Sequence, residues 1–260
     1  MNFFRPFHLV TLSPWPIMGS LSLLFLLLGF VKMMNNSKYN LFMLGMIMLL
    51  MIKFQWWRDV IRESTFQGFH LFKVIKGIRL GMMLFILSEL MFFLSFFWCY
   101  FHMFLSPNIE IGELVPSMNL LIFNPYNMPL LNTIILLSSG ITITYCHYSI
   151  LYMKKKNSLI SIMLTIFLGM MFTLFQYMEY YESYFTISDS IYGSIFFMFT
   201  GFHGIHVLIG TMFIIISYFR LLNNHYSMNH HFGFEGASWY WHFVDIIWLF
   251  VYLLVYWLMY

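Results

Sequence analysis

The sequence predicts an all-α, polytopic membrane protein with seven transmembrane helices, and three observations point to this fold class. First, 61% of the 260 residues are hydrophobic and only 9% are charged, whereas a soluble domain carries roughly 25% charged residues. Second, seven apolar stretches reach the length of about 20 residues that a spanning helix needs. Third, if the chain crosses the membrane seven times, 11 of its 13 basic residues fall on the same side. The low charge also excludes a disordered chain and a nucleic-acid partner.

On the acidic side of the expected spans there is one long loop, over 106–128, that we expect to form an ordered cap or a contact surface. The third and sixth spans are long enough to tilt or to extend beyond the bilayer. None of the seven prolines interrupts the interior of a span, so we expect unbroken helices that pair their own backbone groups in lipid. The spans cover 15–34, 40–57, 79–105, 129–152, 158–181, 190–222 and 234–258.

The charged residues predict the direction in which the chain crosses the membrane. Eleven basic residues fall on one side of the seven spans, and acidic residues gather on the other. An excess of Lys and Arg marks the inner face, so we expect the N-terminus inside and the C-terminus outside. The eleven are Arg5, Lys53, Arg58, Arg62, Lys73, Lys76, Arg79, Lys154, Lys155, Lys156 and Arg220, and the outer acidic residues are Glu110, Glu113, Glu179, Glu182 and Asp189.

Glu89 is the most informative single residue, because it lies about ten residues into its span and hence near the middle of the bilayer. A carboxylate at that depth is costly unless it is paired or protonated. Two interpretations remain open: a functional carboxyl group, or a structural one that hydrogen-bonds a neighbouring helix. In either case we expect a polar partner on the span 190–222, with His203 and His206 as candidates.

His203 and His206 share one helix face because they are three residues apart. Imidazoles at that spacing can bind a metal ion or haem, but the sequence offers no second paired ligand motif. We therefore expect no metal site, and we favour hydrogen bonds of the two histidines to each other, to a backbone carbonyl or to Glu89. Glu-x-x-His pairs, which a di-iron enzyme needs, are also absent.

Two further polar groups lie near the ends of spans. Glu179 and Glu182 are expected to form an acidic, solvated helix end. His230 and His231 precede the last span, where we interpret the polar residues as structural contacts rather than a metal site.

Asp245 lies about two turns inside the last span, deeper than His242. A buried carboxyl group needs a hydrogen-bond partner. We expect a histidine or a tyrosine to supply it.

The connection between the second and third spans is the most polar segment of the chain. Trp56 and Trp57 directly precede Arg58, which places indoles at the level of the headgroups and a cation near phosphate. Glu63 and His70 add groups that can bind a headgroup amine or hydroxyl. Both a specific phospholipid site and a simple interfacial anchor with an ion-paired loop fit this pattern.

Over its whole length the sequence resembles the cytochrome c oxidase subunit III family. The matching strings are long, which makes the resemblance specific. They lie at 13–16, 55–68, 88–93, 172–174, 179–182, 185–189, 200–207, 229–235 and 239–245.

The resemblance implies a cofactor-free subunit of the mitochondrial terminal oxidase, which passes electrons from cytochrome c to oxygen and pumps protons. It implies an inner-membrane location with the N-terminus in the matrix and the C-terminus in the intermembrane space. Subunit I and other complex IV subunits, some carrying haem and copper, would be partners, and a respiratory supercomplex is a further candidate assembly. Phospholipids would occupy a V-shaped cleft between the first two helices (1–70) and the five-helix bundle (71–260).

The resemblance also implies roles for individual residues. The family's cleft or headgroup positions match Trp57, Glu63, His70, Arg79 and Arg220, and its intramembrane carboxylate matches Glu89. The subunit would support the assembly, stability and sustained turnover of the catalytic subunit.

An independent seven-helix transporter or receptor is the main alternative. It would have a solvated ligand cavity and often broken helices. Because the prolines avoid the span interiors, we favour the oxidase subunit.

Overall fold

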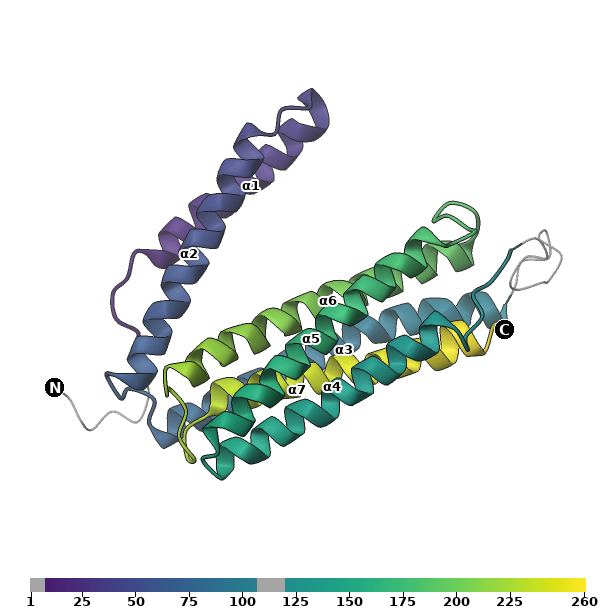
Figure 1. The fold of residues 1–260 in the computed structure, drawn as a ribbon. Coiled ribbons are helices and arrows are strands. Elements are labelled where there is room, and N and C mark those ends of the chain that lie inside the picture. Colours follow the sequence, from purple (N-terminus) through teal and green to yellow (C-terminus); the bar gives the residue numbers. More distant parts are fainter. Residues whose placement is uncertain (1–7, 107–119) are drawn as a thin grey trace. The chain divides into compact units, whose positions relative to one another are not determined.

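The computed structural model describes residues 8–106 and 120–260 of the chain. These residues form seven α-helices, each long and apolar enough to cross a membrane, and contain no β-strand (Figure 1). The predicted fold class and the predicted number of spans are therefore confirmed. The chain divides into two compact units, Met1–Ile78 and Arg79–Tyr260.

The first unit is built on a helical hairpin of α1 (Trp15–Asn36) and α2 (Asn40–Thr65). Ser37 ends α1 with a left-handed backbone conformation, at a φ of 52°. Gly29 and Gly45 lie where the two helices meet, and a Cβ at either position would collide with the backbone of the other helix. Glycine thus permits the close approach that is typical of helix contacts in membranes.

Two helices are longer than the predicted spans. α2 continues to Thr65 rather than ending at 57, and α3 (Phe72–Leu105) begins at Phe72 rather than at 79. Much of the predicted polar connection is therefore helical. Hydropathy marks the residues that lie in hydrocarbon, whereas a helix can continue into the headgroup region with polar side chains. Arg62 supports the longer α2, because a cation in the last turn interacts favourably with the helix dipole.

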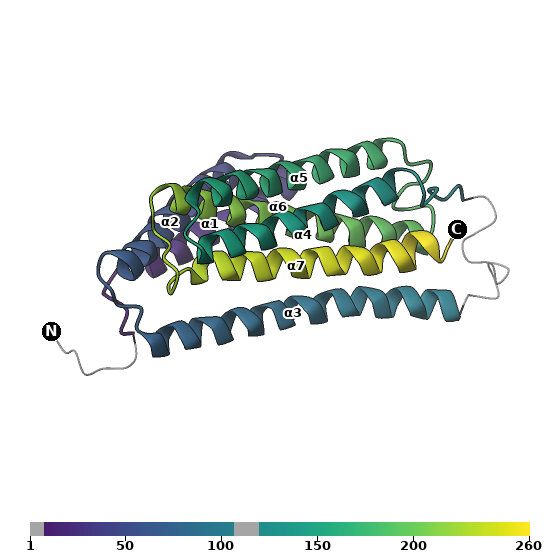
Figure 2. The same ribbon diagram turned by 60° about the horizontal axis from the view of Figure 1, so that its bottom comes forward.

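The second unit contains most of α3 and four further helices. α4 (Met128–Leu151) and α5 (Lys155–Tyr181) form a hairpin, and α6 (Ile191–Leu222) and α7 (Phe232–Val251) follow. α7 passes into a π-helical segment, Tyr252–Trp257. α4 runs beside α7 in both views of the molecule (Figures 1 and 2). The predicted loop cap falls mainly on 107–119, which lies outside the described residues.

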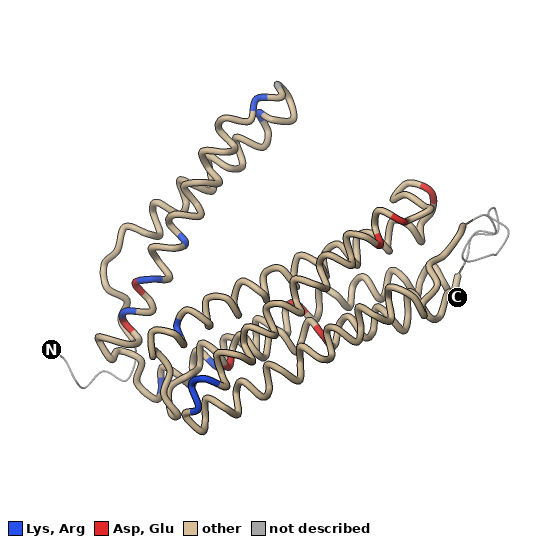
Figure 3. Tube along the Cα trace, viewed as in Figure 1, with Lys and Arg blue, Asp and Glu red and all other residues tan. Residues whose placement is uncertain are grey.

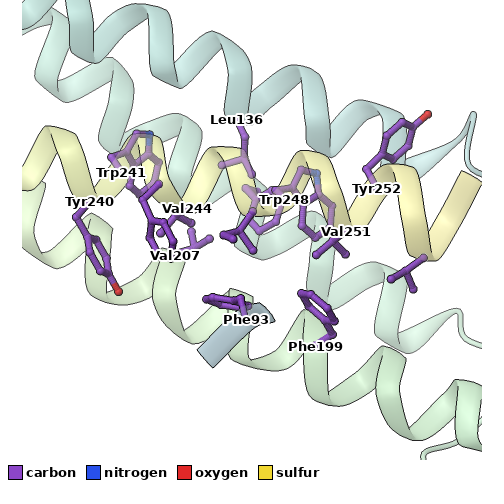
Figure 4. Close-up of a cluster of buried hydrophobic side chains, with 14 of the residues drawn as sticks. Phe93, Leu136, Phe199, Val207, Tyr240, Trp241, Val244, Trp248, Val251 and Tyr252 are labelled. Atoms are coloured by element: carbon purple, nitrogen blue, oxygen red, sulfur yellow. The ribbon is translucent and has the colours of Figure 1, made fainter. Parts of the chain in front are cut away.

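The core of the second unit is aromatic and centres on α7. Within its most apolar stretch, 61% of α7 is buried, against 11% of the corresponding stretch of α3. Trp241 and Trp248 are fully buried in a cluster that also contains Phe93 of α3 and Phe199 of α6 (Figure 4). Gly210 of α6 provides room for one of these indoles, since a Cβ there would lie 2.9 Å from a ring carbon of Trp241. Large rings and glycines therefore interlock in this core.

The basic residues of the second unit gather towards one of its ends (Figure 3). Lys154–Lys156 lie where α4 ends and α5 begins, and Arg220 lies in the last turn of α6 at the same end. Glu182 and Asp189 lie between α5 and α6 at the opposite end. Arg5, Glu110 and Glu113, which contributed to the orientation prediction, lie outside the described residues.

Candidate functional site

A carboxyl–imidazole pair lies between two helices of the second unit. Glu89 Oε2 on α3 is 2.9 Å from His206 Nε2 on α6. The Glu89 side chain is 25% exposed and the His206 side chain 10%. This is the contact that was expected for Glu89 from the scarcity of polar residues at its depth.

The hydrogen bonds of His206 determine how many protons this pair holds. His206 Nδ1 lies 2.7 Å from the Phe202 carbonyl oxygen, which can only accept, so Nδ1 carries a hydrogen. A second hydrogen must lie between His206 Nε2 and Glu89, because two bare acceptors at 2.9 Å would repel each other. The pair is therefore either two neutral groups or an imidazolium–carboxylate ion pair. The ring of Phe93, centred 4.9 Å from that of His206, shields it.

His203 bonds a different helix. Its Nε2 lies 3.1 Å from the Val244 carbonyl oxygen on α7, and the residue is fully buried. Its ring packs on Trp248, with the centroids 4.9 Å apart. One histidine therefore contacts a backbone carbonyl and the other contacts Glu89, in agreement with the structural interpretation of the pair.

Asp245 differs from the expectation. It is buried on α7, but its Oδ1 has no hydrogen-bond partner among residues 8–106 and 120–260. Its Oδ2 faces Gly140 on α4, where a Cβ would lie 3.1 Å from the oxygen. With His242 and Thr144, Asp245 lines a hollow of about 460 Å³ between α4 and α7. His242, one turn earlier on the same helix, lines this hollow as well.

The prediction of a solvated acidic helix end is wrong for Glu179, which is only 1% exposed. Its carboxyl group lies beside Tyr256 in the π-helical segment and near Gln176, one turn back. Glu182, at the end of α5, is exposed as expected. The C-terminal segment buries Glu179, and local hydropathy carries no signal of a segment so distant in sequence.

The carboxylates of α2 bond residues near the N-terminus. Asp59 Oδ2 accepts a hydrogen bond from Trp15 Nε1 at 2.7 Å. Glu63 Oε1 accepts one from Thr11 Oγ1 at 3.1 Å, and Glu63 Oε2 lies 3.1 Å from His8 Nε2. These contacts attach the segment before α1 to the end of α2. The ion-paired interpretation fits Asp59, which also pairs with Arg58, whereas Glu63 is held by a hydroxyl group and an imidazole.

The neighbouring basic and aromatic side chains of α2 are more exposed. Trp57 is 63% exposed and Trp56 is 40% exposed. The Arg58 side chain is also 40% exposed, although its guanidinium lies 3.3 Å from Asp59. His70, beyond the end of α2, is half-buried.

Arg79 and Arg220 both contact the segment around the start of α7. Arg79 Nη2 lies 2.9 Å and 3.2 Å from the two carboxyl oxygens of Glu235. The Arg220 guanidinium lies 4.6 Å from the centre of the Tyr226 ring. Burial, together with the positive charge of Arg220, lowers the pKa of His230 in the loop before α7.

The family model described as cytochrome c oxidase subunit III matches residues 5–260 of this chain. The chain belongs to the cytochrome c oxidase subunit III family. Cytochrome c oxidase subunit 3 of Drosophila melanogaster is 54% identical over 253 residues, which cover 97% of each chain. The Rhipicephalus sanguineus subunit is 54% identical over 254 residues, covering 98% of this chain and 99% of its relative. The Heterololigo bleekeri subunit is 52% identical over 253 residues, covering 97% and 98%.

Membership of the cytochrome c oxidase subunit III family makes this chain a subunit of complex IV, a respiratory oxidoreductase. It therefore acts within a multi-subunit assembly. The independent transporter or receptor considered from the sequence does not fit this membership.

Proposed function

We propose that this subunit binds structural phospholipids and thereby supports the assembly, stability and sustained turnover of the catalytic subunit of the oxidase. In this proposal the chain carries no redox centre, and haem and copper belong to partner subunits. The proposed lipid contacts are Trp56, Trp57, Arg58, Glu63, His70, Arg79 and Arg220.

The observation that carries the proposal is the unequal engagement of charges on α2. Asp59 and Glu63 are bonded by side chains of the segment up to Trp15, which satisfies their negative charge within the protein. Trp57 is 63% exposed beside them, and Arg58 keeps a side chain that is 40% exposed although it pairs with Asp59. The surface therefore offers an indole and a cation to a ligand. An exposed indole next to a cation suits the interface between acyl chains and phosphate.

The expected energy is modest for each residue but adds up over the site. A Lys or Arg near an anionic membrane surface contributes about 1 kcal/mol. A guanidinium also donates two parallel hydrogen bonds to phosphate, which fixes the position of the headgroup. We expect Glu63 to position this surface by holding the N-terminal segment, while Arg58 contacts phosphate directly.

We further propose that the subunit lies in the mitochondrial inner membrane, with its N-terminus in the matrix and its C-terminus in the intermembrane space. The excess of Lys and Arg on one side of the spans supports this orientation. Subunit I and the other complex IV subunits are the proposed partners, within a respiratory supercomplex where one forms. We retain the division into the first two helices (1–70) and the five-helix bundle (71–260) as part of this proposal.

We assign Glu89, His203, His206 and Asp245 as the intramembrane polar set of the subunit. The first three join α3, α6 and α7 through the hydrogen bonds described above. Such bonds hold helices together in a membrane, where hydrophobic burial between helices contributes little.

The test is to count the phospholipids that intact cytochrome c oxidase retains in mild detergent. We compare the native complex with one carrying Trp57→Ala and Arg58→Gln, using native mass spectrometry. We expect the double variant to lose at least one tightly held phospholipid and to lose activity faster during turnover. Added anionic phospholipid should restore the activity.

Two variants serve as matched controls. Trp98→Ala removes another exposed tryptophan, from α3, and Lys38→Gln removes an exposed cation between α1 and α2. Both should keep the native lipid count. Equal lipid retention and equal loss of activity in the double variant and these controls would contradict the proposal.

A further inference from the structure

Three side chains with metal-binding atoms meet where α4 ends and α7 begins. His147 Nε2 lies 3.2 Å from His231 Nε2, and His231 Nε2 lies 3.1 Å from Glu235 Oε1. All three ligand atoms lie within 4.8 Å of one another. His231 and Glu235 are buried, and His147 is half-buried. All three residues belong to the second unit, so one compact body builds the cluster.

The hydrogen bonds of this cluster leave His231 Nε2 and Glu235 Oε1, two acceptor atoms, facing each other at 3.1 Å. His231 Nδ1 lies 3.0 Å from the Ser227 carbonyl oxygen, which can only accept, so Nδ1 carries a hydrogen. In the neutral ring, Nε2 then presents a lone pair towards the Glu235 carboxylate. A hydrogen on His147 Nε2 could be donated to this lone pair. The Glu235 oxygen would then still face His231 Nε2 with no hydrogen between them. Either a second proton on His231 or a metal ion resolves this contact.

The spacing of the ligand atoms suits a metal ion. Zn²⁺ binds imidazole nitrogen and carboxylate oxygen at about 2.0–2.1 Å, so tetrahedral ligand atoms lie about 3.3 Å apart. The observed separations of 3.2 Å and 3.1 Å are close to that value. The bond from His231 Nδ1 to a carbonyl is the outer contact that orients a metal-binding histidine. Two histidines and a carboxylate would leave a fourth position open.

Arg79 contacts the carboxyl group of Glu235 beside the cluster. Its Nη2 is closest to Oε2, at 2.9 Å, whereas Oε1 is the oxygen that faces His231. Nη2 also lies 3.2 Å from Oε1, so Arg79 contacts both carboxyl oxygens while Oε1 alone faces His231. Metal-binding carboxylates are commonly hydrogen-bonded in this way by a neighbouring group. Arg79 is then a positioning residue for Glu235.

We propose that His147, His231 and Glu235 bind one divalent ion of the zinc class, with a fourth position open to water or to a group from a neighbouring subunit. The site is independent of the proposed lipid function and has no redox role, because Zn²⁺ does not change oxidation state. This proposal is opposite to the expectation from the sequence analysis, because His147 and His231 are 84 positions apart and form no local motif.

The test uses the full chain in lipid nanodiscs, stripped with a chelator and then titrated with Zn²⁺ or Co²⁺. Metal content per chain gives the stoichiometry, and the visible spectrum of Co²⁺ reports its coordination. We expect one ion per chain, and about a tenfold or greater loss of affinity in His147→Gln and in Glu235→Gln. His102→Gln, which changes an exposed histidine on α3, should bind like the native chain.

His147→Cys distinguishes ligation from a purely structural role. It keeps a metal-binding atom on residue 147, although nearer the backbone than Nε2, and Co²⁺ bound by this thiolate should show a thiolate-to-metal charge-transfer band. That band would be absent if residue 147 does not touch the ion. The band in the cysteine variant would support ligation by residue 147, and the proposal is overturned if the native chain retains no stoichiometric metal or if His147→Gln binds as tightly as the native chain.

Discussion

In the native chain, Glu89 Oε2 lies 2.9 Å from His206 Nε2. Replacing Glu89 by leucine removes this hydrogen-bond partner of His206. An unsatisfied buried polar group costs about 1–3 kcal/mol. Leucine is also better tolerated than a carboxyl group near mid-bilayer, which offsets part of this loss. The single variant therefore gives an ambiguous change in stability. The coupling between the two residues is the informative quantity.

A double-mutant cycle measures that coupling. The variants are Glu89→Leu, His206→Phe and both together, and the free energy of unfolding is followed by circular dichroism during denaturation in mixed micelles. Hydrogen bonds between helices in membranes average about 0.6 kcal/mol and reach about 1.7 kcal/mol. We expect a coupling of about 1–2 kcal/mol, because this bond joins two ionisable groups with one shared proton.

Glu89→Gln is the matched control for the same pair. The amide N–H₂ can donate to His206 Nε2, so we expect a stability within about 0.5 kcal/mol of the native chain. A coupling indistinguishable from zero would refute the inference that a proton joins these residues. So would an amide variant as unstable as the leucine variant.

Two further predictions concern the aromatic core around Trp241. Gly210→Leu should lower the free energy of unfolding by about 1–3 kcal/mol through overpacking, because even a Cβ added at this position would lie 2.9 Å from the Trp241 indole. Gly204→Ala, with open space at its Cβ, should not. Ser139→Ala should cost about 1–3 kcal/mol because it removes the acceptor of the Trp241 Nε1 hydrogen bond, 2.8 Å long. Ser138→Ala removes no such bond, and equal losses in the two serine variants would contradict this assignment.

The parts of the fold that could be predicted are those that the bilayer imposes. Seven apolar stretches gave seven helices because each span must satisfy its own backbone in lipid. The contact of Glu89 with His206 followed from the same constraint, since few polar residues are available at that depth. The helical extension of α2 to Thr65 was missed because polar residues outside hydrocarbon give no hydropathy signal.

Contacts between distant segments could not be predicted in the same way. Glu179 is buried by Tyr256, and Trp15 bonds Asp59, although nothing local to either residue indicates its partner. For Asp245 the error is the opposite one, because we expected a histidine or tyrosine partner from the sequence. His242, one turn away, does not bond its carboxyl group. Side-chain direction on packed helices decides these cases, and a single sequence does not contain it.

The most direct test of the proposed function is a map of intact cytochrome c oxidase containing this subunit, at a resolution that separates lipid headgroups. The account predicts a headgroup phosphate within about 4 Å of the Arg58 guanidinium, the usual limit for an ion pair, with acyl chain against the Trp57 indole. A map in which both side chains contact only water or protein, with no lipid beside them, would contradict it.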